Sequence, residues 1–272
     1  MTIGICSWTL GIEEPDALMA KIAALGLDGV QYCEPIERHA PEVVRACAEA
    51  HDLRLLAVDP FDCAPATSER ANRETAVEYY RQVIDFAAEL GPDIPVALQG
   101  LSNWTVNCDS REARWAMIVE CCRRLDEYAS DCGVRLLYEP CNRYEVAMIH
   151  TAAEAEALLA EIGSDNIGVL LDSFHMNIEE SDPCAALRRL AGRNGIYHIS
   201  DSGRGGMGTG HIDYIAQHRA LQEGGFNGPV AVELVLPHLA PTGLPRNARE
   251  QQMLDEQIRH SARIWRALES DA

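Results

Sequence analysis

Hydrophobic residues are gathered in short continuous runs along this chain, instead of alternating with polar residues. Eight runs of five or six residues have the composition of buried strands: IGICSW (3–8), GVQYCE (29–34), LRLLAV (53–58), PVALQG (95–100), VRLLYE (134–139), IGVLLD (167–172), IYHIS (196–200) and VAVELV (230–235). Continuous apolar runs of this length are typical of parallel strands that are covered on both faces.

The segments between most of these runs have apolar residues at helical spacing. Clear examples are residues 15–26, 41–52, 112–133 and 151–163. Glycines that fit helix C-terminal stops often precede the next strand, at Gly26, Gly133, Gly163, Gly192 and Gly224. The alternation of strands and helices therefore predicts a parallel sheet with helices outside it.

The number of units favours one architecture over its rival. Eight strand–helix units without a linker or a change in composition predict a single-domain (β/α)8 TIM barrel over residues 1–272. A doubly wound open sheet is the alternative, but no glycine-rich nucleotide loop follows the first strand. The third and fourth units are the weakest, and we expect long loops at residues 59–75 and 101–110, on the side where a barrel builds its active site.

Composition limits the possible partners. The 272 residues are 47% hydrophobic, enough for a large core, and the formal net charge is −19. Such an acidic chain is a poor partner for nucleic acid or for an anionic membrane surface, because both require basic side chains. No apolar run approaches the ~18 residues of a membrane span. A neutral or metal-assisted small molecule is the substrate class that fits best.

The ten cysteines do not predict the disulfide framework of a small secreted protein, because the chain is not small. No CxxC pair occurs, and Met1 runs almost directly into an apolar segment without a signal-peptide pattern. We expect most of the cysteines to be reduced core residues and the protein to be cytosolic.

Four consecutive strands each carry a metal-competent side chain near the C-terminal end. These are Glu139, Asp172, His198 and Glu233. The C-terminal ends of barrel strands meet at one mouth, so the four side chains should lie close together. A set of three carboxylates and one imidazole suits manganese, cobalt or magnesium better than zinc. We therefore predict a divalent-metal site.

Each residue also has an ordinary structural interpretation. Asp172 lies at a strand-to-helix junction in LLDSFHMNIEE and could be a helix N-cap. His198 could be a hydrogen-bonded core histidine, and Glu233 could belong to an ion pair inside the barrel. The occurrence of all four at corresponding positions favours the metal site.

The same residues carry a resemblance to a known family. The stretches EPCNRYE, LLDSFHMNIEE and HISDSGRGGMGTGHID, with Glu233, resemble the xylose isomerase-like barrels and most of all the ketose 3-epimerases that act on D-tagatose and D-psicose. The resemblance covers residues 134–235 well and the remainder only as barrel architecture. It implies that Glu139, Asp172, His198 and Glu233 bind one manganese or cobalt ion, and that the two Glu act as acid and base.

The resemblance further implies that Glu145, His175 and Arg204 contact sugar hydroxyls. For Arg204 the alternative is a solvated loop residue. Trp8 and Trp104 could form apolar walls for the sugar or simply be packing residues. Two differences from the family pattern leave the identity of the sugar undetermined. The eighth strand reads VELVLP where the epimerases usually have Glu-Ser-aromatic, and the loop after the seventh strand is glycine-rich. Family members often form dimers or tetramers.

The predicted function is metal-dependent epimerisation at carbon 3 of a free ketose through an enediolate, with Glu139 and Glu233 on opposite sides of the sugar. Other enzymes on this scaffold remain alternatives: a keto-aldose isomerase, a hydroxypyruvate isomerase or an inosose dehydratase. A sugar-binding protein without turnover is a further alternative, although binding alone does not require two paired Glu residues. The net charge of −19 argues against an apurinic endonuclease, which needs a basic surface to bind DNA.

Overall fold

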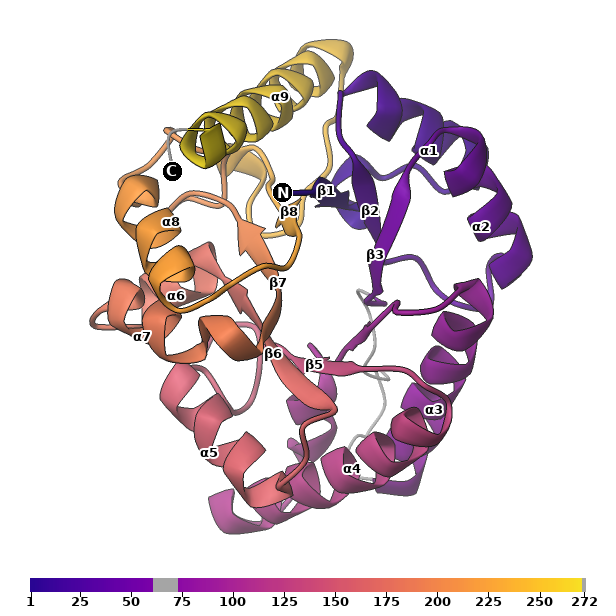
Figure 1. The fold of residues 1–272 in the computed structure, drawn as a ribbon, viewed down its shortest axis with the longest axis vertical. Coiled ribbons are helices and arrows are strands. Elements are labelled where there is room, and N and C mark those ends of the chain that lie inside the picture. The colour runs from indigo at the N-terminus through magenta and orange to yellow at the C-terminus, as the bar shows by residue number, and fades with distance from the viewer. Residues whose placement is uncertain (61–72, 271–272) are drawn as a thin grey trace.

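The strands form one closed parallel barrel in the computed structural model, which describes residues 1–60 and 73–270 (Figure 1). They follow one another around the barrel in chain order, and β8 pairs with β1. Their bounds are β1 Ile3–Cys6, β2 Gly29–Tyr32, β3 Arg54–Val58, β4 Val96–Ala97, β5 Leu136–Tyr138, β6 Ile167–Asp172, β7 Asn194–Ile199 and β8 Val230–Val232. The prediction of a (β/α)8 barrel is confirmed.

The helices form a ring around the barrel (Figure 1). Their bounds are α1 Pro15–Ala24, α2 Pro41–Ala50, α3 Arg73–Leu90, α4 Arg111–Asp131, α5 Ala152–Ile162, α6 Ser173–Glu179, α7 Pro183–Leu190, α8 Tyr214–Glu223 and α9 Ala248–Ser270. Helices α1, α2 and α7 begin with proline, whose fixed φ suits the first helical turn. Helix α9 lies between α8 and α1 in Figure 1, and Lys21 Nζ on α1 is 2.6 Å from Asp255 Oδ2 on α9.

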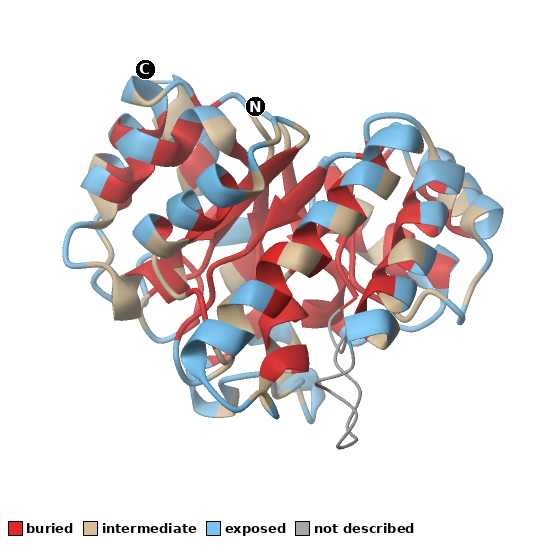
Figure 2. Ribbon diagram, turned by 90° about the horizontal axis from the view of Figure 1, so that it is seen from below, coloured by how far each residue is buried: buried red, intermediate tan, exposed pale blue. Residues whose placement is uncertain are grey.

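The strands are buried except near the N-terminal ends of β3 and β7, and the helices are exposed on their outer sides (Figure 2). At the N-terminal end of the barrel, large and small residues alternate to fill the interior. A Cβ on Gly4 would lie 2.4 Å from Leu56 Cδ1, and a Cβ on Gly195 would lie 2.5 Å from Leu137 Cδ2. Leu56 and Leu137 therefore occupy the space that side chains at Gly4 and Gly195 would need. The four predicted ligand residues lie toward the opposite, C-terminal end of the strands.

Several expected strands are shorter than predicted. Residues 3–8 divide into β1 and the 3-10 helix η1 (Ser7–Leu10), which contains Trp8. Only Val96 and Ala97 of residues 95–100 form β4, where Pro95 has no N–H to donate. Strand β8 ends at Val232, so Glu233 is the first residue beyond it.

The expected loop at residues 59–75 is too long at its C-terminal end, because α3 begins at Arg73. The first turn of α3 carries polar side chains with little burial, and it therefore resembles a loop in composition. Residues 61–72 of that expectation lie outside the described residues. Residues 101–110 contain the short 3-10 helix η3 (Leu101–Thr105) followed by turns.

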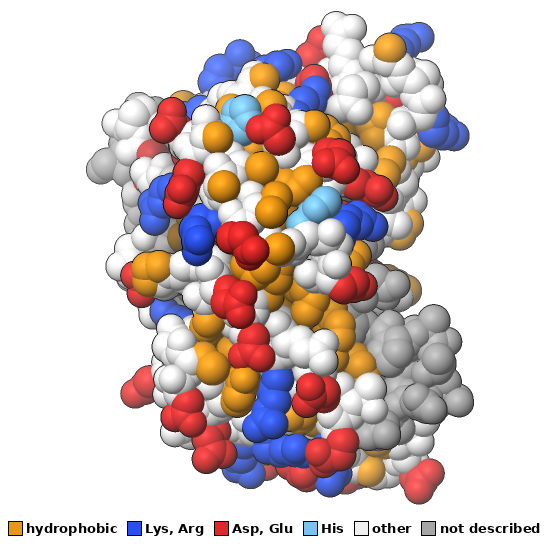
Figure 3. Space-filling view, turned by 90° about the vertical axis from the view of Figure 1, so that its right-hand side faces the viewer, with side chains coloured by type: hydrophobic (Ala, Val, Ile, Leu, Met, Phe, Trp, Pro, Cys, Tyr) orange, Lys and Arg blue, Asp and Glu red, His pale blue; other side chains and the backbone are white. Residues whose placement is uncertain are grey.

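The outer surface mixes charge and apolar residues. On the face in Figure 3, acidic side chains are scattered with Lys and Arg among them, and hydrophobic side chains follow a seam through the middle. No helix among the described residues has the length and hydropathy needed to cross a membrane. All nine cysteines in residues 1–60 and 73–270 are free thiols, as predicted for reduced core residues.

Candidate metal centre

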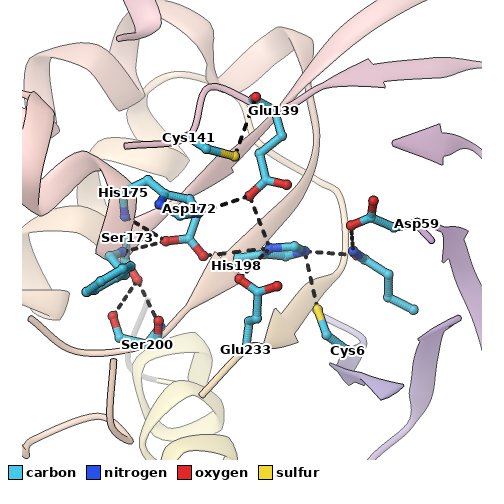
Figure 4. A network of polar contacts seen from close by, with 12 residues as sticks. Cys6, Asp59, Glu139, Cys141, Asp172, Ser173, His175, His198, Ser200 and Glu233 are labelled. Atoms are coloured by element: carbon cyan, nitrogen blue, oxygen red, sulfur yellow. Dashed lines mark hydrogen bonds and ion pairs between the residues drawn. The ribbon is translucent and has the colours of Figure 1, made fainter. Parts of the chain in front are cut away.

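The four predicted ligand residues come together at the C-terminal mouth of the barrel (Figure 4). Glu139 directly follows β5, Asp172 ends β6, His198 lies in β7 and Glu233 directly follows β8. One ligand atom from each residue lies within 4.8 Å of the corresponding atoms of the other three. At most 6% of any of the four residues is exposed.

Nδ1 of His198 is central to this arrangement. It lies 3.7 Å from Glu139 Oε1, 3.6 Å from Asp172 Oδ2 and 3.5 Å from Glu233 Oε2. These separations are long for hydrogen bonds. Two ligand atoms that are each about 2.1 Å from one cation are about 3.0 Å apart at right angles and about 4.2 Å apart when opposite. The observed separations fall within that interval.

Two buried atoms of this group have no hydrogen-bond partner, namely Asp172 Oδ2 and His198 Nδ1. The other oxygen of Asp172 accepts hydrogen bonds from Phe174 N at 2.6 Å and His175 N at 2.9 Å. Asp172 is therefore the N-cap of α6, as the structural interpretation predicted, while its second oxygen faces the cluster. The capping function and the metal hypothesis use different oxygens of one side chain.

The carboxylates of the cluster strongly perturb one another's pKa values. Burial raises the pKa of Glu139 well above its ordinary value, and the charge of Glu233 raises it further. Burial and Glu233 also raise the pKa of Asp172 to about 7. Burial would raise the pKa of Glu233 too, but His198 and Arg204 hold it below its ordinary value. A divalent cation would relieve this repulsion, so the donor set fits one.

Arg204 is buried beside the cluster, with 2% of its surface exposed. Its Nη1 donates to Glu145 Oε1 at 2.7 Å, and its Nη2 lies 3.5 Å from Glu233 Oε2. The guanidinium carbon lies over the rings of Trp8 and Phe174, at 5.5 and 5.0 Å from their centroids. The alternative of a solvated loop residue is therefore wrong for Arg204.

The backbone of Arg204 has a left-handed φ of 61°, which is uncommon for a residue with a side chain. Neighbouring hydrogen bonds hold it there: Arg204 N donates to Asp201 O at 2.7 Å, and Arg204 O accepts from Val235 N at 2.8 Å. The glycine-rich loop after β7 thus directs the guanidinium into the barrel mouth.

His175 and Glu145 are linked through Asn142. The side-chain amide of Asn142 lies 2.8 Å from His175 Nδ1 and donates to Glu145 Oε1 at 2.9 Å. Burial and the charge of Arg204 lower the pKa of His175 to about 4, so this imidazole is neutral near pH 7. Because Nδ1 accepts from Asn142, Nε2 carries the hydrogen, and it lies 3.7 Å from Glu139 Oε1.

The two tryptophans differ in position. Trp8 Nε1 donates to Glu233 Oε1 at 3.0 Å, so Trp8 belongs to the site. Trp104 is buried in the outer core and packs against Tyr79, which favours its interpretation as a packing residue.

Three polar residues of this region were not predicted from the sequence: Asn142, and Gln31 and Asp59 behind His198. Asp59 could have been found, because it directly follows the apolar run 53–58, as Glu139 follows its own strand. Gln31 was a polar residue inside an otherwise buried strand, and Asn142 lay within the quoted EPCNRYE stretch.

Comparisons with known proteins identify the family of this chain. A family model described as the xylose isomerase-like TIM barrel matches residues 19–266. The L-ribulose 3-epimerase of Mesorhizobium japonicum is 30% identical over 213 residues, which cover 78% of this chain and 67% of that protein. The D-psicose 3-epimerase of Enterocloster bolteae is 34% identical over 229 residues, covering 79% and 75%.

A comparison with solved structures finds the same fold. D-psicose 3-epimerase with D-tagatose from Clostridium cellulolyticum H10 has a TM-score of 0.83 at 24% identity, covering 98% of this chain and 99% of that one. The family match and both sequence relatives confirm the resemblance that the motifs predicted. The chain belongs to the xylose isomerase-like TIM barrel family.

Proposed function

We propose that this protein is a divalent-metal-dependent ketose 3-epimerase. The observation that carries the proposal is the convergence of Glu139, Asp172, His198 and Glu233 within 4.8 Å, with two buried ligand atoms that have no hydrogen-bond partner. The oxygen-rich donor set favours manganese, with cobalt or magnesium as alternatives. A bound divalent cation supplies Lewis-acid polarisation of the ketose carbonyl.

Glu139 and Glu233 are the proposed acid and base. In Figure 4 they approach His198 from opposite sides, one from the end of β5 and the other from the end of β8. A sugar between them would have one carboxyl group on each face of carbon 3. One Glu removes the proton there, and the other returns a proton to the opposite face, which inverts the centre.

The contacts favour Glu233 as the first base. Trp8 donates a hydrogen bond to its Oε1, and Arg204 lies near its Oε2, so both neighbours stabilise the ionised form. The nearest basic groups to Glu139 are His198 and the neutral imidazole of His175. Glu139 is accordingly the group that returns the proton, and the two roles exchange in the reverse reaction.

The remaining polar residues orient the sugar in this proposal. Arg204 and the Nε2–H of His175 are donors for sugar oxygens, and Glu145 is an acceptor for a hydroxyl group. Asn142 fixes the relative positions of His175 and Glu145 by contacting both. Placement in the cytosol and assembly into dimers or tetramers stay predictions.

The test is turnover of a substrate panel in deuterated water. Manganese-loaded protein is incubated with D-psicose, D-fructose, D-tagatose and L-ribulose, and the products are identified by chromatography and NMR. We expect interconversion of 3-epimers with deuterium appearing at carbon 3. Exchange at another carbon, or turnover only of an aldose, hydroxypyruvate or an inosose, would contradict 3-epimerisation and identify a different reaction on this scaffold.

A further inference from the structure

A second set of contacts lies behind His198, on the side of the ring that faces away from the three carboxylates. His198 Nε2 is 2.9 Å from Gln31 Oε1, and Gln31 Nε2 donates to Asp59 Oδ2 at 2.8 Å. Gln31 and His198 are completely buried and Asp59 is 6% exposed. In Figure 4, Asp59 and Cys6 lie on this side of the His198 ring. The mechanism proposed above uses none of these contacts.

The direction of each hydrogen bond follows from simple chemistry. An ionised carboxylate only accepts, so the Gln31 amide must point its NH2 group at Asp59. Its carbonyl oxygen then points at His198 and can only accept, which requires the hydrogen of the imidazole to be on Nε2. A neutral imidazole has one N–H, so Nδ1 keeps its lone pair. That lone pair faces Glu139, Asp172 and Glu233.

We propose that Asp59 is a positioning residue that acts through Gln31 to fix the tautomer of His198 and so keeps Nδ1 ready to bind a cation. This inference rests on the metal site of the proposed function. It assigns a function to a carboxylate that is not itself one of the four ligands.

The geometry explains why the tautomer needs to be fixed. Three carboxylate oxygens surround Nδ1 at 3.5–3.7 Å, and they favour a proton on this atom in the metal-free protein. A proton there would occupy the position of the cation and would have to leave before binding. If the Gln31 side-chain amide rotated by about 180°, its NH2 group would face Nε2 of His198. Nε2 would then accept a hydrogen bond, which favours the tautomer with the proton on Nδ1. Hydrogen bonding by Asp59 opposes this rotation.

Cys6 is the other neighbour of Nε2, with its Sγ at 3.6 Å. A thiol is a weak hydrogen-bond partner and can act as donor or acceptor. Cys6 therefore does not select one tautomer, whereas the Gln31–Asp59 pair does.

The decisive variant is Asp59→Asn, which preserves size and burial. An asparagine can offer Gln31 either an oxygen or an NH2 group, so both orientations of the Gln31 amide become possible. Loss of a group that orients a metal-binding histidine commonly weakens metal affinity about 10–100-fold. We expect a loss in this range for manganese, measured by calorimetric titration. The matched control is Asp126→Asn, which alters another buried carboxylate on α4, outside the barrel.

The second measurement uses metal-free protein labelled with 15N-histidine, at a pH high enough for the His198 imidazole to be neutral, because burial lowers the pKa of this group but Glu233 and Asp172 raise it by more. The ring nitrogen shifts of His198 should report Nε2–H in the wild type and a mixture of tautomers in Asp59→Asn. This readout does not depend on metal binding or turnover. If the wild type bound no divalent cation, the proposed function would fail, while the ring shifts would still support or reject the fixed tautomer.

A double-mutant cycle tests the route through Gln31. Gln31→Met removes both hydrogen bonds at similar length, so adding Asp59→Asn to it should cause little further loss of manganese affinity. Additive losses would show that Asp59 acts independently of Gln31 and would overturn the proposal. Unchanged affinity and tautomer in Asp59→Asn, or a rise in KM alone, would also overturn it.

Discussion

Replacing Asp172 by asparagine should separate the two functions of its carboxylate, because the two oxygens face different groups. Oδ1 accepts the hydrogen bonds that begin α6, and an amide oxygen caps a helix about as well as a carboxylate. Oδ2 has no hydrogen-bond partner and would be replaced by an NH2 group, which does not bind a cation. We expect Asp172→Asn to retain the helix cap and to lose manganese binding.

The metal-free variant should also be more stable than the metal-free wild-type protein. The pKa of Asp172 is raised to about 7 in the folded protein by burial and Glu233, against about 3.9 for an unfolded chain. This difference of about 3 units corresponds to at most roughly 4 kcal/mol. An acid whose pKa rises on folding destabilises the folded state as the pH increases from about 4 to about 7. The gain from asparagine should be largest near about pH 8 and should vanish near about pH 4.

Urea unfolding followed by far-UV circular dichroism measures both effects. With EDTA, the unfolding free energy of Asp172→Asn should exceed that of the wild type at alkaline pH and approach it as the pH falls. With manganese at about 100 times its Kd, the wild type should gain about 2.7 kcal/mol and the variant should gain little. Asp182→Asn is the matched control, because Asp182 caps α7 through Ala185 N at 3.0 Å, away from the site. A destabilised Asp172→Asn variant that still gained stability from manganese would refute this reasoning.

Three further predictions concern turnover. Glu139→Gln and Glu233→Gln should each lower kcat by about 10²–10⁴-fold in the presence of manganese, and wild-type kcat in either variant would contradict the two-carboxylate mechanism. EDTA should abolish epimerisation and added manganese should restore it; full activity after chelation and dialysis would exclude a required cation. Arg204→Lys should lower kcat/KM at least about 10-fold with little change in manganese affinity, because an ammonium cannot reproduce the planar fork that lies over the rings of Trp8 and Phe174. An unchanged kcat/KM would show that the fork is not needed.

The barrel could be predicted because its strands are buried on both faces and so appear as continuous apolar runs. The strand ends were less predictable, since a run such as residues 230–235 still contains the apolar Leu234 and Val235 after β8 has ended at Val232. The start of α3 was missed for the opposite reason: its first turn is polar and little buried, and only Ala76 begins its buried side.

The candidate ligands could be found because each lies at or near the C-terminal end of an apolar run. The sequence could not show that the two oxygens of the Asp172 side chain have different functions. The N-cap and ligand interpretations of Asp172 were opposed as alternatives, yet the structure assigns the cap to Oδ1 and leaves Oδ2 facing the cluster. The burial of Arg204 was also hidden, because it depends on a left-handed backbone within a glycine-rich loop.

The most direct test of the shared cation is a crystal structure of the manganese-loaded protein, with anomalous data collected near the manganese absorption edge. We predict one strong anomalous peak per chain, about 2.0–2.3 Å from His198 Nδ1, Asp172 Oδ2 and an oxygen of each of Glu139 and Glu233. A structure with no peak among these four side chains, or with manganese bound only elsewhere, would contradict the account.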